Sequence, residues 1–436
     1  MSKLTDGSSP ALDTRLLRSG RDKMDAYGAI VTPIYQTTAF AFDSCDDAAS
    51  LFSLRRRGHM YGRTSNPTND TLERRLCELE GGTDAVSAAS GKAALMMAVL
   101  SLAATGDNIV SSRNLYGGTY AVFNATLKQM GIEVRFVNAD TPQAFLEAAD
   151  ERTRLFYGET LSNPTLLPFP ISEVAAAGEK IGVPLVVDNT LTPSLVAPLA
   201  LGATATVLSC SKYVAGQGAV LGGSLVVKKR DWLASADRFP MLCGPDPAYG
   251  GAVWSEIGDR LNEDPMALRA RYVVLRDLGG VLSPHSAFLI LQGTETLTLR
   301  MARHSDSAWK VASWLAKQPQ VRRVTYPGVS EPATPVLANG ASGMIGVELS
   351  GGLAAGRRFI DALTLFDHVA NNGDVRSLAI HPASTMLAQL SEKQRQDTGV
   401  SEGYVRLCIG LEDPADLVAD LEQALNLAHS QSTDRD

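Results

Sequence analysis

The chain has 436 residues, of which 45% are hydrophobic and 20% are charged, and its formal net charge is −7. This length exceeds that of a typical single domain, and the composition is that of a folded globular protein rather than a disordered or coiled-coil chain. The mild acidity, without a long Lys/Arg block, disfavours a nucleic-acid-binding protein.

Membrane, secreted and metal-binding classes are also disfavoured. The longest nearly apolar stretch, residues 93–104, is shorter than the roughly 20 residues of a membrane-spanning helix. The polar N-terminus lacks an apolar signal core, so a cytoplasmic protein is expected. The five cysteines form no CxxC pair and the six histidines show no HExxH or HxxxH spacing, so the sequence predicts neither disulfides nor a metal site.

The first 67 residues show little periodicity and are expected to form an extended N-terminal arm that contacts a neighbouring subunit. From residue 68 onward, helical and strand patterns alternate. Asp70 and Glu73 have the spacing of a capping box for a first helix. Ser90 is expected to cap a second, largely buried helix that contains the apolar run 93–104.

Short runs with β-forming residues follow this helix. Strands are predicted at 108–111, 133–137, 154–157, 184–187, 204–208 and 224–227, with helices near 142–149 and 172–181. The alternation implies crossover connections, and therefore a mostly parallel sheet with helices on both faces. A closed (β/α)₈ barrel is the alternative, but its regular alternation should continue past residue 230, and here it does not.

The rest of the chain is predicted to form a smaller α+β domain. Residues 228–283 look irregular, and one long helix is expected from about 285 to 316. Strands at 321–326, 344–349 and 404–409 and helices near 353–363 and 414–427 complete this part. The predicted segments are an arm (1–67), a large domain (68–284), and a linking helix with a small domain (285–436).

Two neighbouring strand ends carry unusual side chains. Asp188 directly follows one strand, and Lys212 lies between hydroxyl-bearing residues after the next, so both are expected over one pocket at the sheet edge. Pyridoxal phosphate (PLP) needs a lysine that forms a Schiff base, an acidic partner for its ring nitrogen and ligands for its phosphate. Further candidates are the helix N-terminus at Gly91 and Lys92, the hydroxyls of Ser209 and Ser211, and the Tyr116 ring. Taken singly, each of these residues also fits an ordinary role as a cap, a turn residue or a surface charge.

Several motifs in order carry a resemblance to a known family. They are residues 61–68 (YGRTSNPT), 106–110 (GDNIV), 115–119 (LYGGT), 187–190 (VDNT), 211–212 (SK), 275–279 (LRDLG), 292–297 (QGTETL), 381–384 (HPAS) and 406–407 (RL). With them the chain resembles the PLP enzymes of Cys/Met metabolism, and among these the O-acetylhomoserine sulfhydrylases, over nearly its whole length. The resemblance implies an α/β fold of the type I PLP transferases, with a seven-stranded, mostly parallel sheet and a smaller C-terminal α+β domain.

The resemblance also implies roles for the candidate residues around the cofactor and the substrate. Lys212 would be the Schiff-base lysine that shuttles protons, and Asp188 would pair with the ring nitrogen. Tyr116 would stack on the ring and assist proton transfer. Arg406 would bind the substrate α-carboxylate with its planar guanidinium. Two further residues, Asn163 and Ser377, would assist near the cofactor O3′ and the carboxylate.

The phosphate ligands implied by the resemblance come from two subunits. Within one chain they are Gly91, Lys92, Ser209 and Ser211, and from the neighbouring subunit they are Tyr61 and Arg63. The resemblance therefore implies an active dimer, with two dimers forming a homotetramer. Lys92 departs from the family pattern, because Gln or Met is common at its position.

The implied reaction is γ-replacement, in which O-acetylhomoserine reacts with sulfide or a thiol to give homocysteine or methionine plus acetate. A γ-lyase that converts methionine or another γ-substituted amino acid to 2-oxobutanoate and ammonia is the alternative, and it uses the same residues. Gly118 and Arg376 stand where γ-lyases of the family carry Cys and Glu, which favours the sulfhydrylase branch. A catalytically inactive scaffold is a third possibility, and the joint retention of the site residues argues against it.

Overall fold

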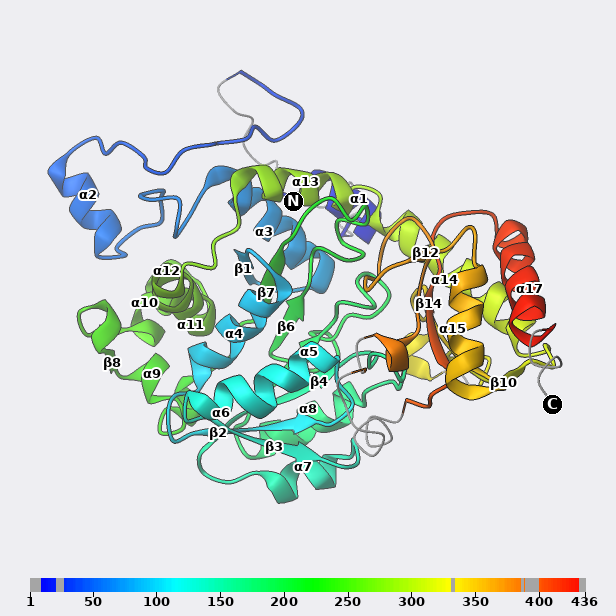
Figure 1. The fold of residues 1–436 in the computed structure, drawn as a ribbon. Helices are drawn as coiled ribbons and strands as arrows, with labels where there is room; N and C mark the ends of the chain where they lie inside the picture. The colour runs from blue at the N-terminus through cyan, green and yellow to red at the C-terminus, as the bar shows by residue number, and fades with distance from the viewer. Residues whose placement is uncertain (1–8, 21–26, 331–333, 386–387, 389–399, 431–436) are drawn as a thin grey trace.

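A computed structural model describes the chain except for residues 1–8, 21–26, 331–333, 386–387, 389–399 and 431–436. A large sheet flanked by helices lies beside a smaller sheet formed by the C-terminal part of the chain (Figure 1). The first two of these gaps, 1–8 and 21–26, fall in the predicted arm, and the described residues of the arm include the short helices α1 (Leu12–Arg18) and α2 (Cys45–Phe52). In Figure 1, α2 and the chain around it extend away from the rest of the molecule.

The large sheet has seven strands in the order β1-β7-β6-β5-β4-β2-β3. The strands are β1 (Asp84–Ala88), β2 (Asn108–Ser112), β3 (Glu133–Val137), β4 (Thr153–Glu159), β5 (Leu185–Asp188), β6 (Ala205–Leu208) and β7 (Gly223–Val227). Only β7 runs antiparallel to its neighbours, β1 and β6. The prediction of a mostly parallel sheet is therefore confirmed, whereas β1 was not predicted.

The helices of this part differ from the prediction at the start of α3 and between residues 117 and 129, where no helix was predicted. They are α3 (Pro67–Glu80), α4 (Gly91–Leu102), α5 (Gly117–Ala121), η1 (Val122–Thr126), α6 (Leu127–Gln129), α7 (Pro142–Ala148) and α8 (Ile171–Lys180). The predicted capping box of Asp70 and Glu73 is wrong, because Asn66 caps α3 by accepting a hydrogen bond from Thr68 N–H. The buried Glu73 instead forms an ion pair with Arg271. Ser90 does cap α4, through Ala93 N–H.

The region 228–283 was predicted to be irregular, and this is wrong. It contains η2 (Leu233–Ser235), α9 (Pro240–Cys243), η3 (Pro247–Tyr249), α10 (Trp254–Leu261), α11 (Pro265–Arg269), η4 (Ala270–Leu275) and α12 (Arg276–Leu278), with a hairpin of β8 (Pro245–Asp246) and β9 (Ala252–Val253). Short elements have too few turns to show a clear hydrophobic period. They are held to strand β1 of the large sheet by Arg271 Nη2, which donates to the Ala85 carbonyl at 2.8 Å, and by Asp264 N–H, which donates to Asp84 Oδ2 at 3.0 Å.

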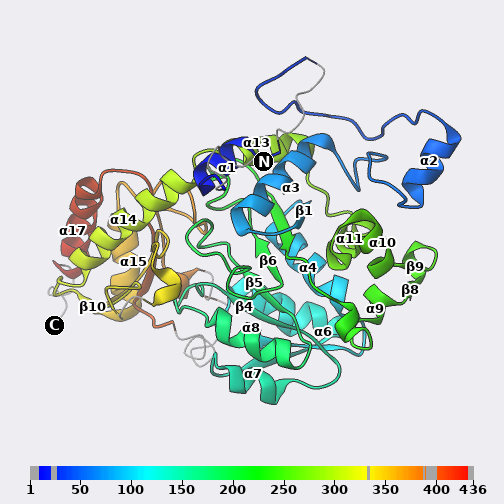
Figure 2. The same ribbon diagram turned by 180° about the vertical axis from the view of Figure 1, so that it is seen from behind.

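The predicted long helix is two helices, α13 (Pro284–Thr294) and α14 (Leu297–Leu315). The break falls where Thr296 leaves the helical region, at φ −119°. The smaller sheet has the order β10-β11-β14-β13-β12, and its helices pack behind it (Figure 2). Its elements are β10 (Val321–Thr325), η5 (Pro335–Leu337), β11 (Met344–Leu349), α15 (Gly352–Ala362), β12 (Asp367–His368), β13 (Leu378–Ile380), η6 (Pro382–Ser384), β14 (Tyr404–Cys408) and α17 (Pro414–Ser430). The short strands β12 and β13 were not predicted.

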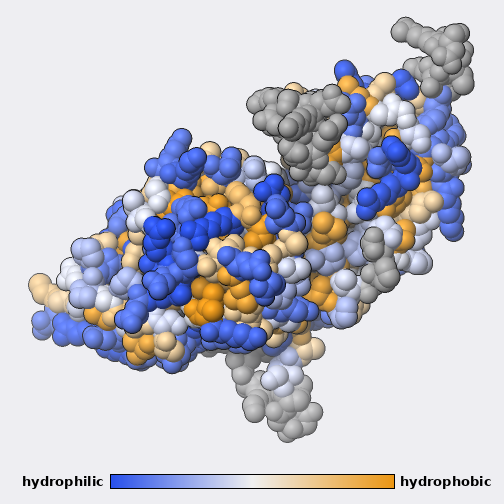
Figure 3. Space-filling model, turned by 90° about the horizontal axis from the view of Figure 1, so that it is seen from below, coloured by the Kyte–Doolittle hydropathy of each residue, from blue (hydrophilic) through white to orange (hydrophobic). Residues whose placement is uncertain are grey.

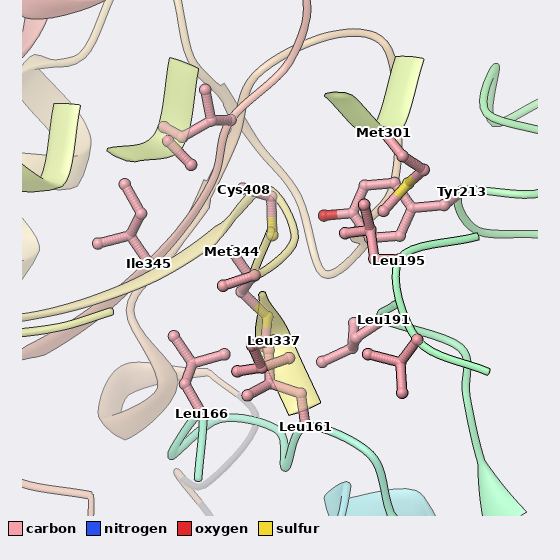
Figure 4. Packing of buried hydrophobic residues seen from close by; sticks show 14 of the residues in the cluster. Leu161, Leu166, Leu191, Leu195, Tyr213, Met301, Leu337, Met344, Ile345 and Cys408 are labelled. Carbon is pink, nitrogen blue, oxygen red and sulfur yellow. The ribbon is translucent and has the colours of Figure 1, made fainter. Parts of the chain in front are cut away.

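The cores of the two sheets are continuous. Leu191 and Tyr213 from the large sheet's loops belong to the same buried cluster as Met344 and Cys408 from the small sheet, as the close view shows (Figure 4). On the face shown in Figure 3, hydrophobic residues form separate patches among hydrophilic ones. Within the described residues, no helix is long and apolar enough to cross a membrane. The shared core fixes the position of the small sheet beside the carboxyl ends of the large sheet's parallel strands.

Candidate active site

A cavity of about 240 Å³ lies where the carboxyl ends of β5 and β6 meet the N-terminus of α4 and the small sheet. It brings together most of the residues predicted for the site. These are Gly91, Lys92, Tyr116, Asn163, Asp188, Ser209, Ser211, Lys212 and Arg406. The cavity also has lining residues that were not predicted, among them Glu159 and Asn371.

The N-terminus of α4 faces the loop after β6 at very short range. A Cβ atom on Gly91 would lie 2.7 Å from Ser209 Cβ, so only glycine permits this approach. The hydroxyl and carbonyl of Ser90 accept hydrogen bonds from Ala93 and Ala94 N–H. The backbone N–H groups of Gly91 and Lys92 come before those of Ala93 and Ala94 in the helix. The first N–H groups of a helix have no hydrogen-bond acceptor within that helix. This end of α4, next to two serine hydroxyls, therefore has the donors and the dipole direction of an anion site.

Asp188 is the last residue of β5 and lies in the cavity wall. Its Oδ1 accepts from Thr190 N–H at 2.9 Å, and its Oδ2 lies 3.5 Å from the Tyr157 hydroxyl. Burial raises the pKa of the Asp188 carboxyl, and hydrogen bonds from Thr190 and the charge of Lys92 partly oppose this. A protonated ring nitrogen would supply the cation that this buried carboxylate lacks at close range.

Lys212 and Arg406 come from different sheets and share one partner. Lys212 Nζ donates to the side-chain oxygen of Asn371, and Arg406 Nη2 donates to the Asn371 carbonyl at 2.9 Å. Arg406 Nη1 also donates to Asn163 Oδ1 at 3.3 Å. Burial, and then the charge of Arg406, lower the pKa of the Lys212 amine. The arrangement places a readily deprotonated amine beside a fixed guanidinium.

Tyr116 lies over the cavity between a cation and a glycine. The Lys92 ammonium is 5.0 Å from the centre of the Tyr116 ring and donates to Thr119 Oγ1 at 2.7 Å. A Cβ atom on Gly118 would lie 2.6 Å from the same ring. Glu159 Oε1 accepts from Tyr116 N–H at 2.8 Å, and burial raises the pKa of this carboxyl well above its usual value. Glu159 is the last residue of β4. In the sequence, only this position at a strand end could have identified it as a candidate site residue.

Three predicted residues do not line this cavity. Arg63 donates to the Arg276 carbonyl at 3.0 Å and lies over the Tyr61 ring, so both stand on the surface around α12. Ser377 is fully buried, and its hydroxyl donates to Glu412 Oε2 at 2.8 Å. Ser377 therefore does not reach this cavity, and Asn371, six residues earlier, occupies the wall instead. Among the residues that the structure describes, no cluster of His, Cys, Asp and Glu could hold a metal ion.

The donor set of the cavity fits PLP. Its lining includes the Lys212 amine, the buried Asp188 carboxylate, the Tyr116 ring, and a helix N-terminus with adjacent hydroxyls. The close approach of Gly91 to Ser209 forms a cradle that any larger side chain would fill. Lys212 would hold the cofactor, Asp188 would face its ring nitrogen, and the end of α4 would hold its phosphate.

Comparison with known proteins gives the same class of molecule. The family described as Cys/Met metabolism PLP-dependent enzymes matches residues 13–426. An O-acetyl-L-homoserine sulfhydrylase of Leptospira meyeri is 41% identical over 95% of this chain and 96% of its own length. O-acetyl-L-homoserine sulfhydrylase 1 of Thermus thermophilus is 43% identical over 90% and 94%. A crystal structure from Campylobacter jejuni, assigned as an O-acetylhomoserine (thiol)-lyase and carrying pyridoxyl-lysine monophosphate, is 38% identical with a TM-score of 0.91, over 96% of this chain and 100% of that one.

Proposed function

Because the chain belongs to the Cys/Met metabolism family of PLP-dependent enzymes, we propose that it catalyses γ-replacement on O-acetylhomoserine. Sulfide or a small thiol replaces the acetyl ester, and the products are homocysteine or methionine plus acetate. The observation that carries the proposal is the joint placement of Lys212 and Arg406 at one cavity, both bonded to Asn371. The names of the similar proteins supply the substrate.

When bound, PLP withdraws electrons from the substrate amino acid and so makes its α- and β-hydrogens acidic. The proposed role of Lys212 is to hold the cofactor and then to move protons at Cα and Cβ of the substrate. Its lowered pKa suits this role, because a neutral amine is required to accept a proton. Asp188 keeps the ring nitrogen protonated, and Tyr116 covers the ring and assists proton transfer.

The Gly91 and Lys92 amides at the end of α4 and the Ser209 and Ser211 hydroxyls would hold the phosphate of the cofactor. Tyr61 and Arg63 would complete this site from a neighbouring subunit, as expected for an active dimer and a homotetramer. Their exposure outside this chain's own cavity is compatible with that role, since Tyr61 is 46% exposed. We also propose three features of the whole chain. They are the arm (1–67), a boundary between residues 284 and 285 that separates the large domain from the linking helix and small domain, and a cytoplasmic location.

The substrate is oriented by the wall that comes from the small sheet. Arg406 binds the α-carboxylate with a bidentate guanidinium, and Asn163 and Asn371 hold that guanidinium in place. Ser377 acts behind this wall: its hydroxyl accepts from Gly410 N–H at 2.8 Å, just beyond β14. Gly118 stands where methionine γ-lyases of the family carry a cysteine, which supports replacement over a methionine γ-lyase.

Incubation with O-acetylhomoserine, with and without sulfide, tests the proposal. We expect homocysteine and acetate in equal amounts when sulfide is present, and little 2-oxobutanoate. Lys212→Ala serves as the inactive control, and Lys310→Ala, at an exposed residue of α14, as the active one. Release of 2-oxobutanoate that sulfide does not suppress would identify a γ-lyase and contradict the proposal.

A further inference from the structure

Asn189, the residue after Asp188, lies in the motif 187–190 but takes no part in the mechanism above. It is fully buried, and both ends of its side-chain amide are used. Its Oδ1 accepts from the hydroxyls of Thr160 and Thr192, at 3.0 and 2.7 Å. Its Nδ2 donates to both carboxyl oxygens of Glu80, at 3.1 and 3.0 Å, and to the Val196 carbonyl at 3.1 Å. One amide thus ties the end of β5 to four other points in the chain.

Glu80 is an unusual partner for this amide. It is the last residue of α3 and only 1% exposed. The carboxyl end of a helix carries partial negative charge, which disfavours an anion there. Its neighbours are two uncharged hydrogen-bonding side chains, Asn189 and Thr206, and the Asp188 carboxylate. Burial, despite the bonds from these side chains, raises the pKa of Glu80 to about 8.

Thr206 adds a contact whose direction depends on the charge of Glu80. The Thr206 Oγ1 atom is buried beside the Glu80 carboxyl, and within the described residues it has no hydrogen-bond partner of ordinary geometry. A protonated carboxyl donates to this oxygen through its O–H while its other oxygen accepts from Asn189. An ionised carboxyl would leave Thr206 as the donor and would bring a second negative charge near Asp188.

The loop from 188 to 190 transmits this anchoring to the cofactor cavity. Thr190 N–H donates to Asp188 Oδ1 at 2.9 Å, and Thr190 Oγ1 accepts from Ser209 N–H at 2.8 Å. The backbone of Asn189 donates to the Val207 carbonyl at 3.0 Å. The anchored turn therefore sets the Asp188 carboxylate and, through Thr190, the Ser209 loop, which are the proposed contacts to the ring nitrogen and the phosphate.

From these contacts we infer that Glu80 and Asn189 form a buried positioning pair for the PLP site, in which Glu80 acts as an uncharged hydrogen-bonding acid. Neither residue touches the cavity, since neither lines it. The inference rests on the role proposed for Asp188, and it does not depend on the substrate. If the pair positions the site, a variant that disrupts the pair should bind PLP more weakly as apoenzyme.

The test is titration of the full-length apoenzyme with PLP, with the dissociation constant and the absorption spectrum of the bound cofactor as readouts. Glu80→Gln keeps an uncharged group of the same shape, and we expect its dissociation constant to stay within about twofold of wild type. Glu80→Ala and Asn189→Leu remove the bonds between the pair, and we expect binding at least tenfold weaker with an altered spectrum. Asp264→Asn is the matched control, because Asp264 is another buried carboxyl that lies away from the cavity; it should bind PLP like wild type.

Two results overturn the inference. If Glu80→Gln binds PLP as weakly as Glu80→Ala, Glu80 acts as an anion. If Glu80→Ala and Asn189→Leu bind like wild type, the pair does not position the site. Glu80→Gln decides the charge state even if Glu80→Ala fails to fold. Asp188→Asn separates this inference from the proposed function: if that variant keeps wild-type affinity and spectrum, the role of Asp188 fails first.

Discussion

The two walls of the cavity are built in different ways. On the large sheet, Asp188 and Lys212 lie at or just after the ends of adjacent parallel strands, so sheet topology alone brings them together. On the small sheet, Arg406 lies in the middle of β14 and Asn371 in the chain between β12 and β13. Their position at the cavity depends on the core shared by the two sheets. The first wall is suited to hold a cofactor, and the second is suited to bind a substrate.

The largest effect is expected on the cofactor wall. Lys212→Ala should abolish turnover, with a loss of at least 10³-fold in kcat, because no other amine in the cavity stands in the same place. Lys92 is the other lysine in the wall, but it is bonded to Thr119. The fold should persist, as measured by circular dichroism and by the melting temperature. Substantial residual turnover would show that another group carries out the proton transfers.

A smaller effect is expected where the walls meet. Asn371→Ala removes the partner of Lys212 Nζ while leaving the backbone carbonyl that accepts from Arg406. We expect kcat to fall roughly 10-fold, the cost of losing one hydrogen bond between uncharged groups, with a smaller change in KM. Asn371→Ser should recover part of the loss. An increase in KM alone would place Asn371 in substrate binding only.

The pH dependence of PLP capture by the apoenzyme tests the electrostatic interaction between Arg406 on one wall and Lys212 on the other. Because burial and the Arg406 charge lower the pKa of Lys212, its neutral form persists to lower pH than in an exposed lysine. Arg406→Gln removes the cation, so the pKa of Lys212 should rise and its neutral fraction at neutral pH should fall. The rate at which apoenzyme captures PLP, measured against pH, should therefore shift to higher pH in this variant. An unchanged profile would rule out electrostatic coupling between the two side chains.

The smallest effect is expected at Lys92. Lys92→Met removes the cation beside the Tyr116 ring, a contact worth about 0.5–2 kcal/mol, so a several-fold decrease in kcat/KM is expected. Lys92→Arg should retain most activity, because it keeps a cation. Lys128→Met, at an exposed lysine of α6, is the matched control and should behave like wild type. Equal losses in the Met and Arg variants would mean that the shape of Lys92 matters rather than its charge.

The sequence predicted the cofactor wall better than the substrate wall. Asp188 and Lys212 could be located because strand ends are readable from local patterns. Asn371 could not, since the loop that carries it follows the two-residue strand β12, which leaves no periodic signal. Glu159 was missed because the predicted strand ended at residue 157, which placed this carboxylate in the following loop rather than at the end of β4. Asp70 was misread as a cap because the competing Asn66-Pro67 pair, which starts α3, lies just before it.

One experiment tests directly whether the large-sheet wall binds PLP while the small-sheet wall binds the substrate. The dissociation constant for PLP and the KM for O-acetylhomoserine should be measured side by side in Asp188→Asn and Arg406→Gln. We predict that Asp188→Asn weakens PLP binding with little change in KM once the enzyme is saturated with cofactor. Arg406→Gln should raise KM at least tenfold with PLP affinity nearly unchanged at a pH where its Lys212 is neutral. If both variants change the same constant, the two walls do not act separately and the account is wrong.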